Sequence, residues 1–242
     1  MTVNVTPLKP KFHFPDPNEK LYPESDGEPM AETGFHVTLI VYVLAMLRAF
    51  FKDRQDVYAG GNMFVYFEEG EPTRKVSPDV FVAFGVPRHE RKSWFTWKEG
   101  KGLDVVFEFT SKSTQSEDKG WKKGLYEWLG VKEYFLFDPT AEYLEPQLQG
   151  YRLVEGSYQP IPIMEGRLQS ETLGLTIGAE GQMVTLVITA TGERLLPPEE
   201  ALTARREAES RMMTEAEARR KAEAEVERLR AELERLQGQL KE

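Results

Sequence analysis

The hydrophobic positions of residues 103–114, LDVVFEFTSKST, fall on both faces of a two-residue period. A run that is apolar on both faces predicts a strand buried on both sides of a sheet. Glu108 lies in the middle of this run, where an ionised carboxylate is costly unless a partner or a metal ion offsets its desolvation. The pattern therefore predicts a buried strand in which the burial of the Glu108 carboxylate needs a chemical explanation.

The same kind of pattern predicts the elements on either side of this strand. Upstream, residues 32–52 predict a helix, and residues 62–68 and 76–84 predict two strands. Downstream, STQSEDKGWKKGLYEWLG predicts a helix that begins near Ser116 and ends at Gly130, and VKEYFLFDP predicts another buried strand. Strand, helix and strand in this order indicate a βαβ crossover. With further short strands to about residue 190, the predicted fold class is mixed α/β, with a central mixed sheet flanked by helices.

Three segments of the chain differ in composition. Residues 1–30 are rich in proline and charge and predict an extended arm, residues 31–192 predict the folded domain, and residues 197–242 change abruptly to Glu, Ala, Arg and Leu. The last segment has apolar residues at alternating spacings of three and four, the a/d pattern of a coiled coil, at Val226, Leu229, Leu233, Leu236 and Leu240. One interpretation is self-association into a homodimer through this helix. The other is a lone, solvated helix rich in i,i+4 ion pairs.

Composition restricts the classes of function. The absence of cysteine excludes disulfides and thiolate metal sites and fits a reducing cytoplasm. The N-terminus lacks the apolar run of a signal peptide, and the longest apolar run, residues 35–47, is too short to span a bilayer comfortably, so we expect a cytoplasmic protein with no membrane partner. The net charge of −9 argues against a generic polyanion binder. Residues 88–123, however, hold nine Lys or Arg against six Asp or Glu, so positive charge gathers around Glu108.

A second acid, Asp79, opens the hydrophobic strand of SPDVFVAF. Two carboxylates on neighbouring strands can converge on one divalent cation, and Mg²⁺ or Mn²⁺ accepts such oxygen ligands while keeping several waters. A cation held there would polarise a phosphodiester and lower the pKa of an attacking water. Taken alone, Asp79 is better explained by a turn and Glu108 by pairing with a lysine. Together, and beside the local positive charge, the two acids predict a metal site.

The lysine that this chemistry needs has two candidates. Thr110 occupies the position two residues after Glu108 on the same strand face, and Lys112 lies past the expected end of the strand. In the following helix, Lys122 shares a face with Asp118 and Tyr126 rather than with the solvated charges. A lysine on this packing face is placed to reach back toward the two acids.

The loop RHERKSWFTWKEGK lies between the two acidic strands. Its basic side chains can contact phosphates, and its aromatic side chains can stack on unpaired bases. The candidates for nucleic-acid binding are Arg88, Arg91, Lys92, Trp94, Trp97 and Lys98. The alternative is that one tryptophan anchors the loop to the core and that the charges are merely solvated.

Four segments in this order and spacing resemble the Uma2 (DUF820) family of restriction endonucleases over roughly residues 32–185: SPDVFVAF, DVVFEFTSKST, the series Asp118, Lys122 and Tyr126, and GVKEYFLFDP. The family belongs to the PD-(D/E)XK nuclease superfamily. The resemblance therefore implies a restriction-endonuclease-like core and metal-dependent hydrolysis of phosphodiester bonds. It also implies that Asp79 is the acid of the PD motif, that Glu108 is the second acid, and that Lys122 stands in for the strand lysine of other superfamily members.

The resemblance implies supporting roles as well and leaves one choice open. Thr110 matches this family in the usual lysine position, but Lys112 stands where the family usually has a proline. The catalytic lysine is therefore Lys112 or Lys122, and we prefer Lys122. Asp118 is expected to brace this lysine and Tyr126 to bond a phosphate or simply to pack. Glu32 is the candidate for a further acid from the N-terminal helix. The alternative is that Glu32 only begins that helix.

The function predicted from the sequence is a Mg²⁺- or Mn²⁺-dependent endonuclease acting on DNA. Asp79 and Glu108 are the expected metal ligands, and Lys122 is expected to orient the attacking water or to stabilise charge on the phosphate. The alternative from another class is a catalytically silent nuclease-fold protein that assembles through its coiled coil. A nuclease acting on RNA, or on a particular nucleic-acid structure, would use the same site.

Overall fold

The computed structural model describes residues 22–23, 34–112 and 114–239 and, within the last helix, the side chains as far as residue 230. The chain divides into two compact units, residues 1–195 and residues 196–242.

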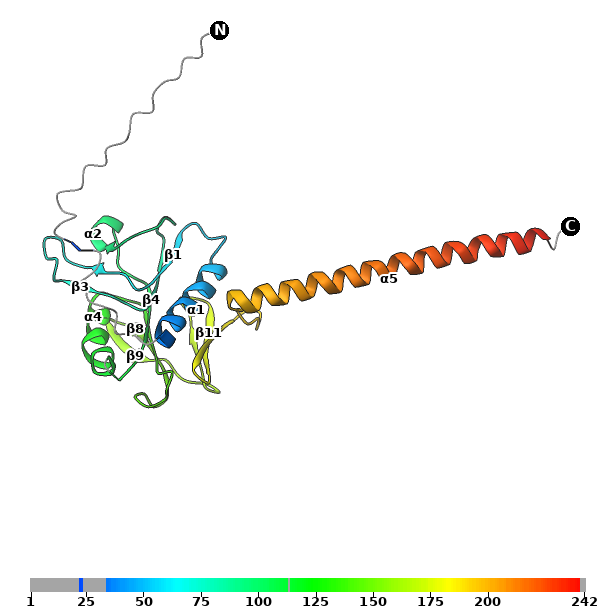
Figure 1. Cartoon of the computed structure of the whole chain (residues 1–242). Coiled ribbons are helices and arrows are strands. Elements are labelled where there is room, and N and C mark those ends of the chain that lie inside the picture. Colours follow the sequence, from blue (N-terminus) through cyan, green and yellow to red (C-terminus); the bar gives the residue numbers. More distant parts are fainter. Residues whose placement is uncertain (1–21, 24–33, 113, 240–242) are drawn as a thin grey trace, which may run out of the picture. The chain divides into compact units, whose positions relative to one another are not determined.

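A six-stranded mixed sheet is the centre of the first unit, with the strand order β1-β4-β6-β7-β8-β9 (Figure 1). Strands β6 and β7 are parallel, and each of the other neighbouring pairs in this sheet is antiparallel. The strands are β1 (Val57–Gly60), β4 (Val80–Phe84), β6 (Val105–Phe109), β7 (Glu133–Phe137), β8 (Leu148–Val154) and β9 (Ser157–Pro160). The central mixed sheet expected from the sequence is therefore confirmed.

The parallel pair is joined by helical turns rather than by one regular helix. The connection consists of α3 (Gln115–Glu117), a π-helical segment η1 (Asp118–Lys122) and α4 (Lys123–Trp128). Tyr126 of α4 packs in a buried cluster with residues of β4, β6 and β7, so this crossover covers one face of the sheet.

Helix α1 (Gly34–Phe50) covers the opposite face of the central sheet. It contacts β1, β4 and β6 and also β12, a strand of a separate antiparallel sheet, so it is packed between the two sheets (Figure 1). That sheet has the order β10-β11-β12, with β10 (Arg167–Ser170), β11 (Leu175–Glu180) and β12 (Met183–Ile188). Six buried side chains of α1, His36 among them, explain why its sequence is so apolar.

A third, small sheet completes the unit. It has the order β3-β2-β5, made of β2 (Val65–Tyr66), β3 (Lys75–Val76) and β5 (Trp94–Phe95), and β5 is followed by the short helix α2 (Thr96–Glu99). The strands expected over 62–68 and 76–84 are thus shorter, and the second is divided between β3 and β4. The turn between β3 and β4 is where Asp79 lies.

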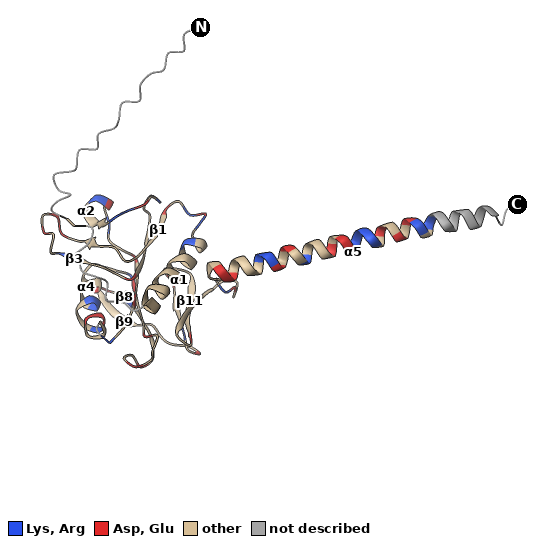
Figure 2. Cartoon of the chain, viewed as in Figure 1, with Lys and Arg blue, Asp and Glu red and all other residues tan. Residues whose placement is uncertain are grey.

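The second unit contains one long helix, α5 (Pro198–Gln239), of 42 residues. The side chains from 198 to 230 are all exposed, Val226 and Leu229 among them, and charges of both signs follow one another along the helix (Figure 2). Ion pairs at i,i+4 join Arg205 to Glu209 and Arg219 to Glu223. The side chains of Leu233 and Leu236, and all of Leu240, lie outside the described residues. Both interpretations of this segment, the coiled coil and the solvated helix, therefore stay predictions.

No helix among the described residues is both long enough and apolar enough to cross a membrane.

Candidate active site

The two acids singled out in the sequence lie opposite each other on neighbouring strands. In the antiparallel β4–β6 pair, Val80 is opposite Phe107, and one further step in the same register sets Asp79 opposite Glu108. The Asp79 carboxylate is held at two points: Oδ2 accepts a hydrogen bond from the Phe109 backbone N–H at 2.6 Å, and Oδ1 lies 3.2 Å from His36 Nε2. Asp79 is therefore fixed beside the strand that carries Glu108.

Glu108 is almost completely buried, with 1% of its side chain exposed. Its two oxygens have different partners: Oε1 accepts a hydrogen bond from the Tyr126 hydroxyl at 2.7 Å, and Oε2 accepts one from Lys122 Nζ at 3.0 Å. The same Lys122 Nζ lies 3.0 Å from Asp118 Oδ1. One ammonium group therefore joins two buried carboxylates. The partners of Glu108 in the middle of its strand are thus Lys122 and Tyr126.

The crossover aligns three of these side chains by their spacing. Asp118, Lys122 and Tyr126 follow one another at intervals of four residues, and Asp118 and Lys122 are the two ends of the π-helical segment η1. Single π-helical turns inside helices are rare and occur frequently at functional sites. Tyr134 on β7 fixes this turn to the sheet, because its hydroxyl donates to the Asp118 carbonyl at 3.0 Å. Lys122 and Tyr126 contact Glu108 on β6, and Asp118 contacts Lys122.

Burial dominates the electrostatics of the cluster. It raises the pKa of Glu108 well above the usual value for a glutamate; Lys122 and Tyr126 lower it, and the nearby Asp79 and Asp118 raise it further. Burial alone would lower the pKa of Lys122, but Glu108, Asp118 and Asp79 outweigh burial and raise it, so Lys122 keeps its proton. Three carboxyl groups thus surround one permanent cation, and negative charge is in excess when all three are ionised.

The donor set fits a hard divalent cation that keeps most of its water. A carboxylate has about four lone-pair positions, and each of the two strand acids uses two for the partners above. Both Asp118 oxygens are buried and receive no hydrogen bond, although one of them faces Lys122. Among the described residues, no three His, Asp or Glu side chains form a group able to hold a metal by themselves. Mg²⁺ often takes only one or two carboxylates and completes its shell with water and substrate oxygens.

The remaining predicted residues of the site are placed as follows. Thr110 follows the end of β6 and is buried, and its hydroxyl has no hydrogen-bond partner among the described residues. Lys112 is exposed, whereas Lys122 is the lysine in contact with Glu108. Glu32 lies outside the described residues.

The loop before β6 separates into buried and exposed residues. Trp94 is fully buried, and its indole N–H donates to the Lys101 carbonyl at 3.2 Å, so no face of its ring is open to a base. Arg91 is also buried; it donates two hydrogen bonds to Glu99 and covers the Tyr58 ring. Trp94 thus lies where the alternative interpretation places an anchoring tryptophan, and Arg91 is paired within the loop rather than solvated.

The other candidates of this loop differ in exposure: Lys92, Lys98 and Arg88 are exposed, and Trp97 is half-buried. Lys98 Nζ lies over the Phe95 ring, and Trp97 packs against the same ring. The exposed basic residues of the loop remain available as candidate contacts for nucleic acid.

Two residues at the site were not assigned to it from the sequence. His36 contacts Asp79, which is 43 residues away in the chain. Gly61 packs on the backbone of Asp79 so closely that a Cβ atom there would lie 2.2 Å from the Asp79 carbonyl oxygen. The Gly-Gly pair at 60–61 was a signal for such a close approach.

The chain matches one family of known proteins. A family model described as "Putative restriction endonuclease", Uma2, matches residues 11–186. A solved structure, titled a "putative nuclease belonging to DUF820" from Anabaena variabilis, is similar with 15% sequence identity and a TM-score of 0.45, over 62% of this chain and 81% of that chain. A comparison with curated proteins found no match. Because the family model spans most of the chain, the protein belongs to the Uma2 family of restriction-endonuclease-like nucleases.

Proposed function

We propose that this protein is a metal-dependent endonuclease that hydrolyses phosphodiester bonds of DNA at the cluster of Asp79, Glu108 and Lys122. The observation that carries the proposal is the position of Lys122 Nζ, 3.0 Å from Glu108 and 3.0 Å from Asp118 in a nearly closed environment. A scaffold gains little from such an arrangement, because buried ion pairs are weak evidence for stability. Membership of a nuclease family gives the chemistry that the cluster would serve.

Asp79 and Glu108 are the residues that would hold Mg²⁺ or Mn²⁺. When bound, the cation polarises the phosphodiester and lowers the pKa of a water molecule. The chain's own part is to hold these two carboxylates in fixed positions: the Phe109 N–H and His36 orient Asp79, and Tyr126 and Lys122 orient Glu108. Oriented carboxylates need no rearrangement when the substrate arrives.

Lys122 is the residue proposed to act on the substrate. Its raised pKa keeps it a cation, and three N–H donors allow it to contact Glu108, Asp118 and one further oxygen at the same time. A third acceptor within reach would be either the attacking water or a phosphate oxygen on which negative charge develops. Asp118, one turn earlier in the crossover, holds the ammonium group of Lys122 in position.

The test combines metal binding with cleavage on the same protein samples. Titration calorimetry with Mg²⁺ and Mn²⁺, together with plasmid nicking, is carried out on the wild type, on Glu108→Gln and on Glu117→Gln. Glu117 is an exposed acid at the start of the crossover and is the matched control. We expect Glu108→Gln to lose both activities and Glu117→Gln to keep both. Wild-type protein that binds neither metal with DNA present would refute the proposal, and RNA cleaved in preference to DNA would change its substrate.

The second candidate is an interaction protein that assembles through α5, and exposure of every described side chain of that helix favours it. Homodimerisation through the segment 197–242 would also pair two active sites, which suits double-strand cleavage. Sedimentation of the full chain and of a chain ending at residue 196 tests this. We expect a dimer that becomes a monomer on truncation, and a full-length monomer at all accessible concentrations would exclude self-association.

A further inference from the structure

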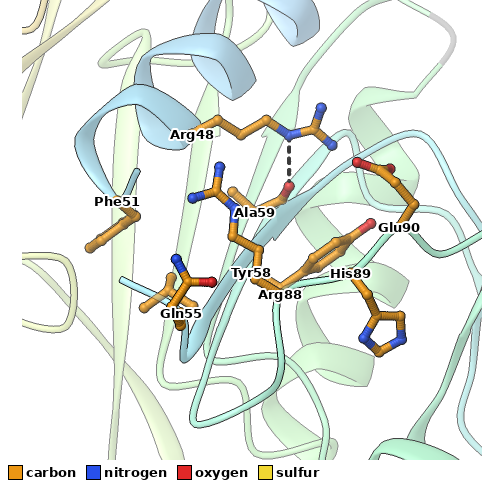
Figure 3. Close-up of a pocket in the computed structure, with 9 residues that line it drawn as sticks. Arg48, Phe51, Gln55, Tyr58, Ala59, Arg88, His89 and Glu90 are labelled. Carbon is orange, nitrogen blue, oxygen red and sulfur yellow. Dashed lines mark hydrogen bonds between the residues drawn. The ribbon is translucent and has the colours of Figure 1, made fainter. Parts of the chain in front are cut away.

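A cavity of about 460 Å³ lies at the C-terminal end of α1, beside the edge strand β1 (Figure 3). Its lining includes two arginines, Arg48 and Arg88, and it does not include the acids or the lysine of the candidate active site. The cavity is therefore a separate feature of the same unit, and its chemistry needs its own explanation.

Both arginines are held in place by backbone carbonyls. Arg48 donates from Nε to the Ala59 carbonyl at 3.0 Å, and Arg88 donates from Nη1 to the Lys52 carbonyl at 2.7 Å. A guanidinium has five N–H donors, so each keeps most of its donors after these bonds. No acidic side chain within the described part of the chain pairs with either of them. Two oriented guanidinium groups at one cavity favour an oxyanion with several oxygens, such as a phosphate.

Tyr58 adds an unsatisfied donor to the same lining. Only 4% of this residue is exposed, and its hydroxyl has no hydrogen-bond partner in the described structure. Figure 3 shows the hydroxyl on the Glu90 side of the cavity. Burial raises the pKa of Tyr58, so the hydroxyl keeps its proton. A buried donor without an acceptor is costly, and an acceptor oxygen of a ligand would remove that cost.

The lining charges favour a phosphate anion. Arg48 and Arg88 supply two positive charges and Glu90 supplies one negative charge, so the charged side chains have a surplus of one positive charge. This surplus attracts a phosphodiester and a phosphate monoester alike. A nucleic-acid strand presents its phosphodiester beside further phosphates, so, unlike a free monoester, it can also contact basic residues outside the cavity.

The cavity also has a defined separation from the active site along α1. His36 contacts Asp79 near the start of this helix, and Arg48 is twelve residues further on. At 1.5 Å per residue the two Cα atoms are about 18 Å apart along the axis. Successive phosphates of one strand advance by about 3.4 Å along the axis of a duplex, so the separation corresponds to roughly five nucleotides.

We propose that this cavity binds a backbone phosphodiester of the nucleic-acid substrate, about five nucleotides from the bond at Asp79 and Glu108, through Arg48, Arg88 and the Tyr58 hydroxyl. The distance to the bond rests on the proposed nuclease function, whereas the binding of a phosphodiester at the cavity does not. The site acts on affinity and substrate length and not on the chemical step.

The experiment measures binding apart from cleavage. Fluorescence anisotropy with labelled DNA single strands of about 4 and about 12 nucleotides, which present few and many phosphates to the protein, is carried out in EDTA on the full chain. The wild type is compared with the double variant Arg48→Gln/Arg88→Gln. The matched control is Arg54→Gln, because Arg54 is an exposed arginine paired with Asp56 outside this lining. Adenosine monophosphate is used as competitor, and the unfolding midpoint of each variant is recorded.

We expect the double variant to bind the longer strand at least about tenfold more weakly, the loss typical of charge-assisted hydrogen bonds, and the shorter strand, which can occupy the cavity by itself, more weakly as well. Arg54→Gln should match the wild type on both strands. Glu90→Gln should bind the longer strand about two- to fivefold more tightly, because it removes a negative charge that repels the phosphate. Interactions between exposed charges are usually of this size. This last variant leaves both arginines in place, so it tests the site even if the double variant fails to fold.

Equal affinity of all variants for the longer strand would overturn the proposal. Competition by adenosine monophosphate as strong as by an equal concentration of the unlabelled longer strand would also overturn it and would assign the cavity to free nucleotides. Nicking with Mg²⁺ is measured in parallel. Arginine-dependent binding without nicking refutes the nuclease proposal alone, and nicking without arginine-dependent binding refutes the cavity proposal alone.

Discussion

Replacing Lys122 by methionine should destabilise the first unit by about 3–5 kcal/mol at neutral pH, the usual cost of breaking a buried ion pair by removing one partner. Methionine keeps the length and apolar volume of the side chain and removes only the charge. Lys122 is 12% exposed and contacts two carboxylates that are each 1% exposed, at 3.0 Å. At an effective dielectric constant of about 20, one such contact contributes about 5 kcal/mol, and the desolvation of the ammonium group offsets much of the sum.

The destabilisation should depend on pH in a defined direction. Burial raises the folded-state pKa of Glu108, and Lys122 is the strongest of the groups that lower it, so removing Lys122 raises it further. A carboxyl group with a raised folded pKa contributes stability that is fully present below its unfolded pKa, about 4.3. That contribution is lost as the pH rises through the folded pKa. The difference between variant and wild type should therefore grow from acidic to alkaline pH.

Urea unfolding followed by tryptophan fluorescence measures this difference, because all four tryptophans lie in residues 1–195. The control is Lys119→Met, which removes an exposed lysine of the same segment and should change the free energy of unfolding by no more than about 0.5 kcal/mol. Two results would refute the reasoning. One is a Lys122→Met variant within about 1 kcal/mol of the wild type at pH 8, well below the range for a broken buried pair. The other is a deficit that shrinks as the pH rises.

Four further substitutions, the last of them a control, test other parts of the structure by the same unfolding assay. Gly61→Ala forces a Cβ atom against the Asp79 carbonyl, so it should lower stability by about 1–3 kcal/mol and weaken Mn²⁺ binding; unchanged calorimetry would contradict this. Burial raises the pKa of Asp104, but hydrogen bonds from two lysines and a backbone N–H outweigh burial and lower it. Asp104→Asn should therefore cost about 2 kcal/mol at pH 7, and the deficit should fade below about pH 4, as the pH falls through the folded pKa. Trp94→Ala should cost about 3–5 kcal/mol, and Trp128→Ala, at a residue 71% exposed, no more than about 0.5 kcal/mol; equal costs would refute the assigned burial.

The strand that carries Glu108 could be predicted because it is apolar on both faces, which is a local property of the sequence. The face shared by Asp118, Lys122 and Tyr126 could be predicted for the same reason, since four-residue spacing aligns side chains whether the turn is α-helical or contains the π-helical segment. Strand β1 (Val57–Gly60) was missed. Its four residues are too few for a periodic pattern, and it forms because β4 offers it hydrogen bonds along one edge.

Contacts between distant segments could not be predicted from the sequence, because they depend on how the elements pack against one another. The approach of His36 to Asp79 depends on how α1 lies across the sheet, and no periodicity within α1 records that angle. The loop before β6 offered two tryptophans as alternative anchors, and the choice of Trp94 follows from packing against Tyr58 and Phe81, which come from other strands. The residue types in the sequence therefore indicated which side chains could form these contacts, and tertiary packing determined which of them do.

The cluster around Glu108 is a poor arrangement for stability alone. A buried carboxyl group with a raised pKa, next to two further acids, opposes folding at neutral pH, and apolar residues of similar volume would often stabilise the same place. Specific contacts nevertheless hold the cluster in place. A π-helical turn brings Lys122 between two acids, and Tyr126 donates a hydrogen bond to Glu108. Unfavourable charge held by specific supports is typical of sites whose chemistry needs that charge. The proposed nuclease activity would account for the burial of Glu108 in the middle of a strand, which the stability of the fold alone does not explain.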